Sequence, residues 1–118
     1  MSHEPRDNAP RRVAHIGIAV DDLDQSLLFY RRALGLEVSE VIDVPERGMR
    51  IAMLPCGDLV LELMESTGPD SQIGRFLERR GPGIHHLCLQ VDDIDAKLAD
   101  LAEQGVELVS STSEVGAE

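Results

Sequence analysis

Two histidines, His15 and His86, open two similar ten-residue segments of this 118-residue chain. The segments read HIGIAVDDLD and HLCLQVDDID, and their first residues are 71 positions apart. We infer a tandem duplication, because a histidine, a valine and three aspartates recur while aliphatic residues replace one another elsewhere. A pseudo-symmetric fold would bring the two imidazoles together, and imidazoles are common ligands of divalent transition metals. The repeat therefore predicts a metal site.

A third candidate ligand is Glu62, which has apolar neighbours on both sides in the segment LVLELM. Burying a lone carboxylate costs several kcal/mol unless a nearby charge compensates it, and a metal ion would do so. Two alternatives stay open: a strand face exposed to water, or an ion pair with an arginine such as Arg50. Two imidazoles and one carboxylate suit Fe(II), Mn(II), Co(II), Ni(II) or Zn(II) equally.

Three further residues are candidates for chemistry. Successive strand residues point to opposite faces, so only one residue of the pair His85 and His86 can match His15. The repeat selects His86, and we expect His85 to be a surface or turn histidine. Cys88 shares the face of His86, where we expect it to pack rather than act as a nucleophile. Glu46, in the turn PERG, is a candidate general base, although turn solvation explains it equally well.

The elements that must position these residues follow from the hydrophobic pattern. The residues His15, Gly17 and Ala19 share the roomier face of a strand over 13–20. The aspartates that follow predict a capped helix that ends at Gly35. Further strands are expected within 36–44, 49–54 and 59–64, then a connecting helix within 68–83 capped by Asp70 or Ser71. The second copy predicts a strand over 86–91, a helix over 94–103 and a strand over 106–110.

These elements predict an α+β fold of tandem β-α-β-β-β modules. We expect a mobile N-terminal arm over 1–12 and one domain over 13–118. The domain divides into a first module (13–67), the connecting helix (68–83) and a second module (84–118). By the repeat, the second module is truncated, because two strands of the first copy have no counterpart before Glu118.

Composition restricts the classes of partner. A net charge of −11 and a pI near 4.6 disfavour binding to nucleic acid or to an acidic membrane surface. The chain has two cysteines and no apolar stretch long enough for a signal peptide or a membrane span. We therefore expect a cytoplasmic protein. An unpaired sheet edge in the second module favours a homodimer.

Four stretches carry a family resemblance: HIGIAVDDLDQSLLFYRRALGLEVSE, VPERGM, LELMESTGPDSQIGRFL and GPGIHHLCLQVDDIDAKLADLAEQGVEL. They resemble the vicinal oxygen chelate superfamily, which includes glyoxalase I, extradiol dioxygenases and bleomycin-resistance proteins. Within it they look most like the methylmalonyl-CoA epimerases. The resemblance implies a cupped mixed sheet with helices outside, around a divalent metal held by His15, Glu62 and His86. The family's fourth ligand, a glutamate, would fall at about position 132, beyond Glu118.

The resemblance also implies an activity. An epimerase of this family would interconvert the C2 epimers of methylmalonyl-CoA by proton transfer, through an enolate that a metal ion, cobalt by resemblance, stabilises. The substrate would be an acyl-CoA thioester, and Glu46 is the carboxylate nearest to the position of one family base. Two alternatives remain: a glyoxalase I-like isomerase, and a metal-free small-molecule binding protein like the bleomycin-resistance members.

Overall fold

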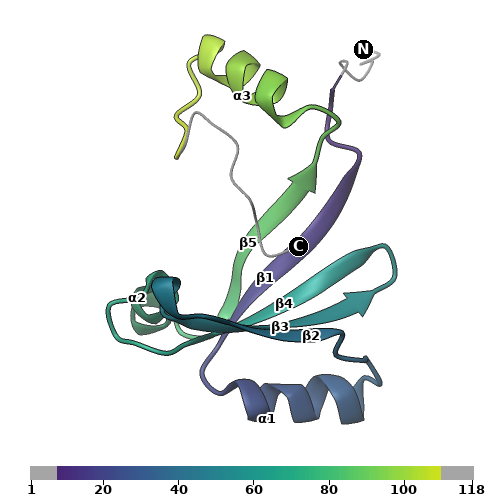
Figure 1. Ribbon diagram of the computed structural model, residues 1–118, viewed down its shortest axis with the longest axis vertical. Helices are drawn as coiled ribbons and strands as arrows, with labels where there is room; N and C mark the ends of the chain where they lie inside the picture. The colour runs from purple at the N-terminus through teal and green to yellow at the C-terminus, as the bar shows by residue number, and fades with distance from the viewer. Residues whose placement is uncertain (1–7, 110–118) are drawn as a thin grey trace. The chain divides into compact units, whose positions relative to one another are not determined.

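The computed structural model describes residues 8–109, which contain five strands and three α-helices (Figure 1). In chain order the elements are β1 (Arg12–Val20), α1 (Leu23–Leu28), β2 (Glu40–Val44), β3 (Met49–Cys56), β4 (Leu59–Ser66), α2 (Gln72–Arg80), β5 (Gly83–Gln90) and α3 (Ile94–Glu103). The chain divides into a larger unit, 13–88, and a smaller unit made of 1–12 and 89–118. The prediction of one domain over 13–118 stays a prediction.

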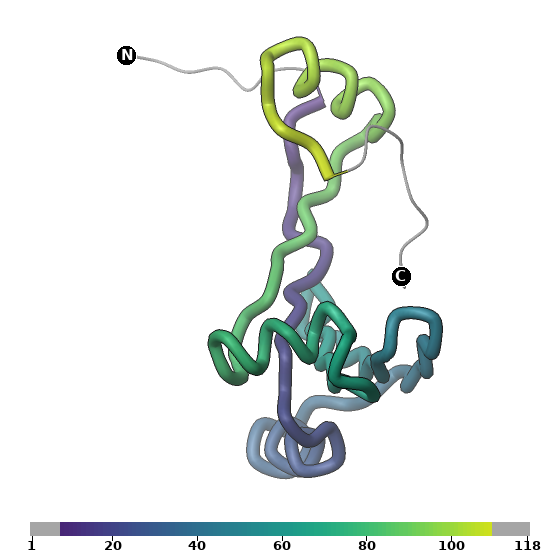
Figure 2. Tube along the Cα trace, turned by 90° about the vertical axis from the view of Figure 1, so that its left-hand side faces the viewer, coloured from purple at the N-terminus to yellow at the C-terminus, as the bar shows by residue number. Residues whose placement is uncertain are grey.

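The larger unit is built on a mixed sheet with the strand order β2-β3-β4-β1-β5. Strand β1 is parallel to β4, whereas β2 with β3 and β3 with β4 are antiparallel pairs. Both views show β1 and β5 side by side (Figures 1 and 2). The order β1, α1, β2, β3, β4 is the predicted β-α-β-β-β module, and the predicted α+β fold is confirmed.

The sheet of this unit buries apolar side chains on both faces. Val20, Leu54 and Leu63 belong to the core under α1. The opposite face carries a second core, in which Ala19 and Ile73 of α2 are buried. Because strand residues alternate, His15 and Gly17 lie on the same face of β1 as Ala19. The candidate site therefore shares a sheet face with α2 and lies opposite α1.

Helix α1 begins as predicted, but its last turn is wider than an α-helix. The backbone N–H of Gln25 donates to the carboxylate of Asp22, the N-cap, at 3.1 Å. The helix then continues as a π-helical segment, Phe29–Ala33, in which the N–H of Leu34 bonds to the carbonyl of Phe29. Gly35 follows with a φ of 78°, a conformation that favours glycine.

The connecting helix α2 is shorter than the predicted 68–83. Ser71 is its N-cap, and the Ser71 hydroxyl accepts a hydrogen bond from the N–H of Gly74 at 2.8 Å. The hydroxyl of Ser66 bonds to the carbonyl of Gly68 at 2.6 Å, which holds the preceding turn. Residues 68–71 therefore form the turn and cap, because a cap residue has extended rather than helical dihedrals. Gly81, with a φ of 74°, ends the helix.

The smaller unit holds α3, whose bounds are those predicted. The carboxylate of Asp93 accepts from the N–H of Ala96 at 3.0 Å, as Asp22 does one repeat earlier. The side chain of Asn8 bonds to the backbone carbonyl and N–H of Asp93 at 2.7 and 2.8 Å. Within the predicted arm, residues 8–12 thus include a hydrogen-bonded segment. Positions 1–7 lie outside the described residues, where the arm stays a prediction.

The strand predicted over 106–110 is wrong for 106–109, which contain no regular strand. The N–H of Val106 bonds to the carbonyl of Leu101 at the end of α3, after Gly105 with a φ of 82°. A strand needs partners for its backbone N–H and C=O groups, and here the first of these N–H groups already bonds to the end of the helix. Position 110 lies outside the described residues.

Candidate metal centre

Three neighbouring strands of the larger unit bring His15, Glu62 and His86 together. Gly17 of β1 lies opposite Glu62 of β4, so His15 and Glu62 are diagonal neighbours on one sheet face. His86 comes from β5, on the other side of β1. Each residue offers a ligand atom, and these atoms all lie within 4.8 Å of one another. The three residues that the sequence singles out as ligands therefore form one cluster.

The spacing of the two imidazoles fits a shared metal ion. The Nε2 atoms of His15 and His86 lie 3.1 Å apart, and their rings are nearly perpendicular. Two nitrogens that each lie about 2.1 Å from one ion are about 3.0 to 3.4 Å apart for bond angles of about 90° to 109°. The donor pair fits a divalent ion without rearrangement of the strands.

Glu62 is buried beside His15. Only 3% of the residue is exposed, and its Oε2 lies 3.2 Å from Nδ1 of His15. This contact leaves Nε2 of His15 directed toward His86. A carboxylate beside one nitrogen of a histidine favours a proton on that nitrogen, so the other nitrogen can present its lone pair to a metal. The strand face that carries Glu62 is thus not open to water.

Arg50, the alternative partner for Glu62, faces the opposite side of the sheet. Its guanidinium lies 3.3 Å from Asp43 and 3.5 Å from Glu65. Glu65 is three residues from Glu62 on β4, and an odd spacing places the two on opposite faces. The alternative of an Arg50–Glu62 ion pair is therefore wrong.

His86 is held in its neutral form by its surroundings. Burial lowers the pKa of His86 below its usual value, and the neighbouring His15 and His85 lower it further. A histidine must be neutral to bind a metal, so this environment favours the ligand form at neutral pH.

Gly17 makes room for the His86 ring. A Cβ atom at position 17 would lie 2.2 Å from Cε1 of His86 and 2.6 Å from its Nδ1. No real Cβ makes such a contact, so any other residue would displace the ring. The sequence predicts a roomier face for β1, and the His86 ring occupies that space.

His85 is where the sequence-based expectation fails. It is half-buried, and its Nδ1 lies 2.9 Å from Nδ1 of His86. Its ring also packs edge-on against Phe76 of α2, with centroids 4.9 Å apart. Strand alternation fixes the direction of Cβ but not of a whole ring, so it could not exclude this contact. Only the doublet of histidines signalled it.

A family model described as the glyoxalase/bleomycin resistance protein/dioxygenase superfamily matches residues 14–118. The chain belongs to this superfamily. The resemblance inferred from the four sequence stretches is thereby confirmed, and so is the glyoxalase-like fold.

Two similar superfamily members and one solved structure carry epimerase names. Mouse mitochondrial methylmalonyl-CoA epimerase is 37% identical over 107 residues, which are 90% of this chain and 60% of that protein. Ethylmalonyl-CoA/methylmalonyl-CoA epimerase of Cereibacter sphaeroides is 37% identical over 85% of this chain and 75% of its own. A Streptomyces coelicolor methylmalonyl-CoA epimerase in complex with 2-nitronate-propionyl-CoA has a TM-score of 0.83, at 36% identity over 92% and 80% of the two chains. This chain spans about 60% of the length of the mitochondrial relatives.

Neither Glu46 nor Cys88 belongs to the cluster of candidate metal ligands. Glu46 is exposed in the 3₁₀ turn Pro45–Arg47. Strand β3 places Met53 opposite Glu62, so its residues on the site face are methionines and an isoleucine rather than carboxylates. Cys88 is a half-buried residue of β5. The role of Glu46 as a base stays a prediction.

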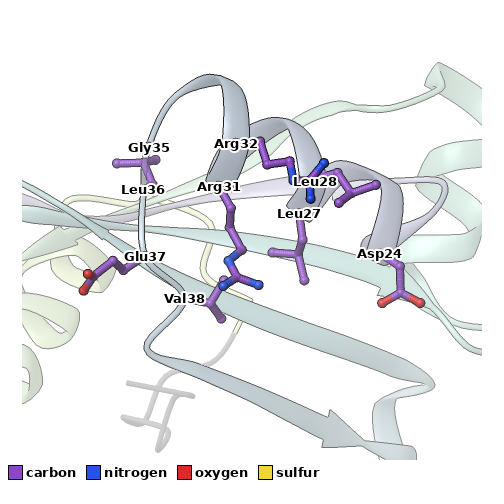
Figure 3. Close-up of a pocket in the computed structure, with 9 residues that line it drawn as sticks. All are labelled: Asp24, Leu27, Leu28, Arg31, Arg32, Gly35, Leu36, Glu37 and Val38. Carbon is purple, nitrogen blue, oxygen red and sulfur yellow. The ribbon is translucent and has the colours of Figure 1, made fainter.

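A pocket on the α1 side of the sheet is separate from the cluster. It has a volume of about 760 Å³ and is lined by α1, the π-helical segment and residues 35–38 (Figure 3). Leu27 and Val38 of its lining pack on the α1 face of the sheet, opposite His15. Among residues 8–109, no helix has the length and apolar character to cross a membrane.

Proposed function

We propose that the protein is a metal-dependent epimerase that interconverts the C2 epimers of methylmalonyl-CoA. The observation that carries the proposal is the cluster of half-buried His15, buried Glu62 and half-buried His86 in a chain similar to epimerases along most of its length. The similar Streptomyces coelicolor epimerase binds an acyl-CoA compound, which supports an acyl-CoA thioester as substrate. Cobalt is the metal we propose first, with Zn, Mn, Ni and Fe as alternatives. A homodimer and a cytoplasmic location belong to the same proposal.

The reaction asks for stabilisation of negative charge next to C2. Removing the C2 proton of methylmalonyl-CoA leaves an enolate, and a divalent ion held by the three residues would stabilise that charge as a Lewis acid. The chain's own part is to present two neutral imidazoles. Glu62 lies beside Nδ1 of His15, and burial lowers the pKa of His86 below its usual value. The buried carboxylate also offsets part of the charge of a divalent ion.

Metal loading and proton exchange test this function. We expect the purified protein to bind Co(II) and to exchange the C2 proton of methylmalonyl-CoA with deuterium from solvent, which NMR measures. His86→Ala should lose both metal and exchange, because it removes one of two facing imidazoles. Glu37→Gln, at an exposed glutamate of the pocket that α1 lines, is the control and should behave as the parent does.

Two results would contradict the proposal in different ways. A metal-loaded parent that exchanges no proton but isomerises a glutathione hemithioacetal would indicate a glyoxalase I-like isomerase. A parent that binds no metal but retains a small ligand would indicate a binding protein. The same preparation serves both measurements.

Inversion at C2 needs a base on each face of the carbon, and we propose Glu46 as one of them. Strand β3 offers no carboxylate on the site face, and Glu46 stands in the turn that precedes this strand. Glu46→Gln should lower the exchange rate by about 10²- to 10⁴-fold, with the Co(II) affinity unchanged. Glu37→Gln is again the control. Exchange at the parent rate in Glu46→Gln would place the base elsewhere.

A further inference from the structure

His85 contacts the cluster from outside the set of candidate ligands. Its Nδ1 lies 2.9 Å from Nδ1 of His86, whereas the other ring nitrogen of His86, Nε2, faces His15 at 3.1 Å. The ring of His86 is therefore engaged at both nitrogens. His85 is not part of the group whose ligand atoms lie within 4.8 Å of one another.

The contact fixes which nitrogen of His86 carries the proton. Two imidazole nitrogens at hydrogen-bond distance share one proton unless a metal ion lies between them, so one donates and the other accepts. A nitrogen that binds a metal must present its lone pair, which leaves the proton of a neutral His86 on Nδ1. His86 then donates through Nδ1, and His85 accepts. With a metal ion on Nε2, the contact with His85 would set both the tautomer and the orientation of His86.

His85 is itself held by α2. The ring of Phe76 packs edge-on against His85 at a centroid distance of 4.9 Å and an angle of 80°. Phe76 in turn packs on the core that includes Ile73 and Met64. On the other side of the His86 ring, Gly17 leaves no room for a methyl group. The His86 imidazole is thus enclosed by the backbone of β1 and by His85.

We propose that His85 is a positioning residue for the metal site: its Nδ1 accepts the Nδ1 proton of His86 and so directs the Nε2 lone pair of His86 toward the metal. The proposal rests on the proposed metal site. Partners of this kind around a ligand histidine typically change metal affinity by about 10- to 100-fold. His85 touches neither the metal nor the substrate in this role.

Two substitutions separate hydrogen bonding from packing. His85→Phe keeps a ring against Phe76 but has no acceptor, so Co(II) should bind about 10- to 100-fold more weakly than to the parent. His85→Asn places an oxygen near the position of Nδ1 and should restore most of the affinity. Phe76→Leu should give a smaller loss, and its matched control Phe29→Leu, at an exposed aromatic on the α1 side, should give none. Thermal unfolding of each metal-free variant checks the fold.

A spectroscopic signature follows the proton itself. In the Co(II)-loaded parent, the Nδ1 proton of His86 should give a shifted NMR signal that is present in H₂O and absent in D₂O. We expect that signal to be lost in His85→Phe and retained in His85→Asn. Equal affinities for parent and His85→Phe, or equal losses in His85→Phe and His85→Asn, would overturn the role of His85 while the metal site stands. A parent that binds no Co(II) would overturn both.

Discussion

Gly17 gives the tightest steric requirement at the candidate site. Its position is fixed by the pairing of β1 with β4, where it lies opposite Glu62, and a Cβ there would overlap the His86 ring. We expect Gly17→Ala to lower the free energy of unfolding by about 1–3 kcal/mol, the usual cost of overpacking. Co(II) affinity should fall at least about tenfold, because the ring must move away from His15. Urea unfolding and metal titration measure the two effects.

Gly68→Ala is the control for this substitution, because a Cβ at Gly68 would meet nothing within 4 Å. Its free energy of unfolding should stay within about 0.5 kcal/mol of the parent value. Parent-like metal affinity in Gly17→Ala would contradict this prediction, because it would show that the His86 ring can shift and still bind the metal.

The lowered pKa of His86 predicts how acid affects the metal-free protein. The unfolded chain takes up a proton on this histidine near pH 6.5, whereas the folded chain does so only at lower pH. Acid therefore favours the unfolded chain, and the free energy of unfolding should decrease as pH falls below about 6.5. Urea unfolding at several pH values should show a smaller decrease for His86→Gln. An equal decrease would assign the effect to other groups.

At the scale of elements, the two copies of the repeat begin their helices in the same way. Asp22 and Asp93 are the N-caps of α1 and α3, and each accepts from the N–H three residues later. We expect Asp22→Ala and Asp93→Ala each to cost about 0.5–2 kcal/mol of stability, measured by urea unfolding. Asp22→Asn and Asp93→Asn keep a capping oxygen and should cost much less. Equal losses for Ala and Asn would mean that charge, not capping, matters.

Local signals explain which elements could be predicted. The aspartate caps, Gly35 and Gly105 act within a few residues, so the starts and ends of α1 and α3 follow from the sequence. Backbone hydrogen bonds decide two further features, the π-helical turn and the absence of a strand at 106–109. The sequence carries no comparable local signal for these bonds. The repeat predicted that His15 and His86 meet, but only the pairing of β1 with β4 places Glu62 beside them.

At the scale of the whole molecule, β5 is the terminal strand of the five-stranded sheet that the structure describes. It exposes Ile84 and Leu87, at 64% and 58%. An exposed edge with apolar side chains invites pairing, so we expect a homodimer through β5. Leu87→Lys should weaken dimerisation at least about tenfold in analytical ultracentrifugation. Val41→Lys, on the opposite edge strand β2, should not.

A monomeric parent would contradict the expected dimer, and loss of the dimer in Val41→Lys would place the interface on the other edge. The parent and the two variants thus distinguish a monomer, a dimer through β5 and a dimer through β2.

The meeting of His15 and His86 also has an evolutionary consequence. Two copies of a half-length protein that associate about a two-fold axis present identical residues to each other, so equivalent histidines would face across the interface. Duplication and fusion would then preserve an imidazole pair that was already useful. Fusion also frees the copies to diverge: Gly17, which admits the His86 ring, has Cys88 as its counterpart 71 residues later. The two copies therefore contribute differently to the site. The first copy leaves space at Gly17, and the second copy fills that space with the His86 ring.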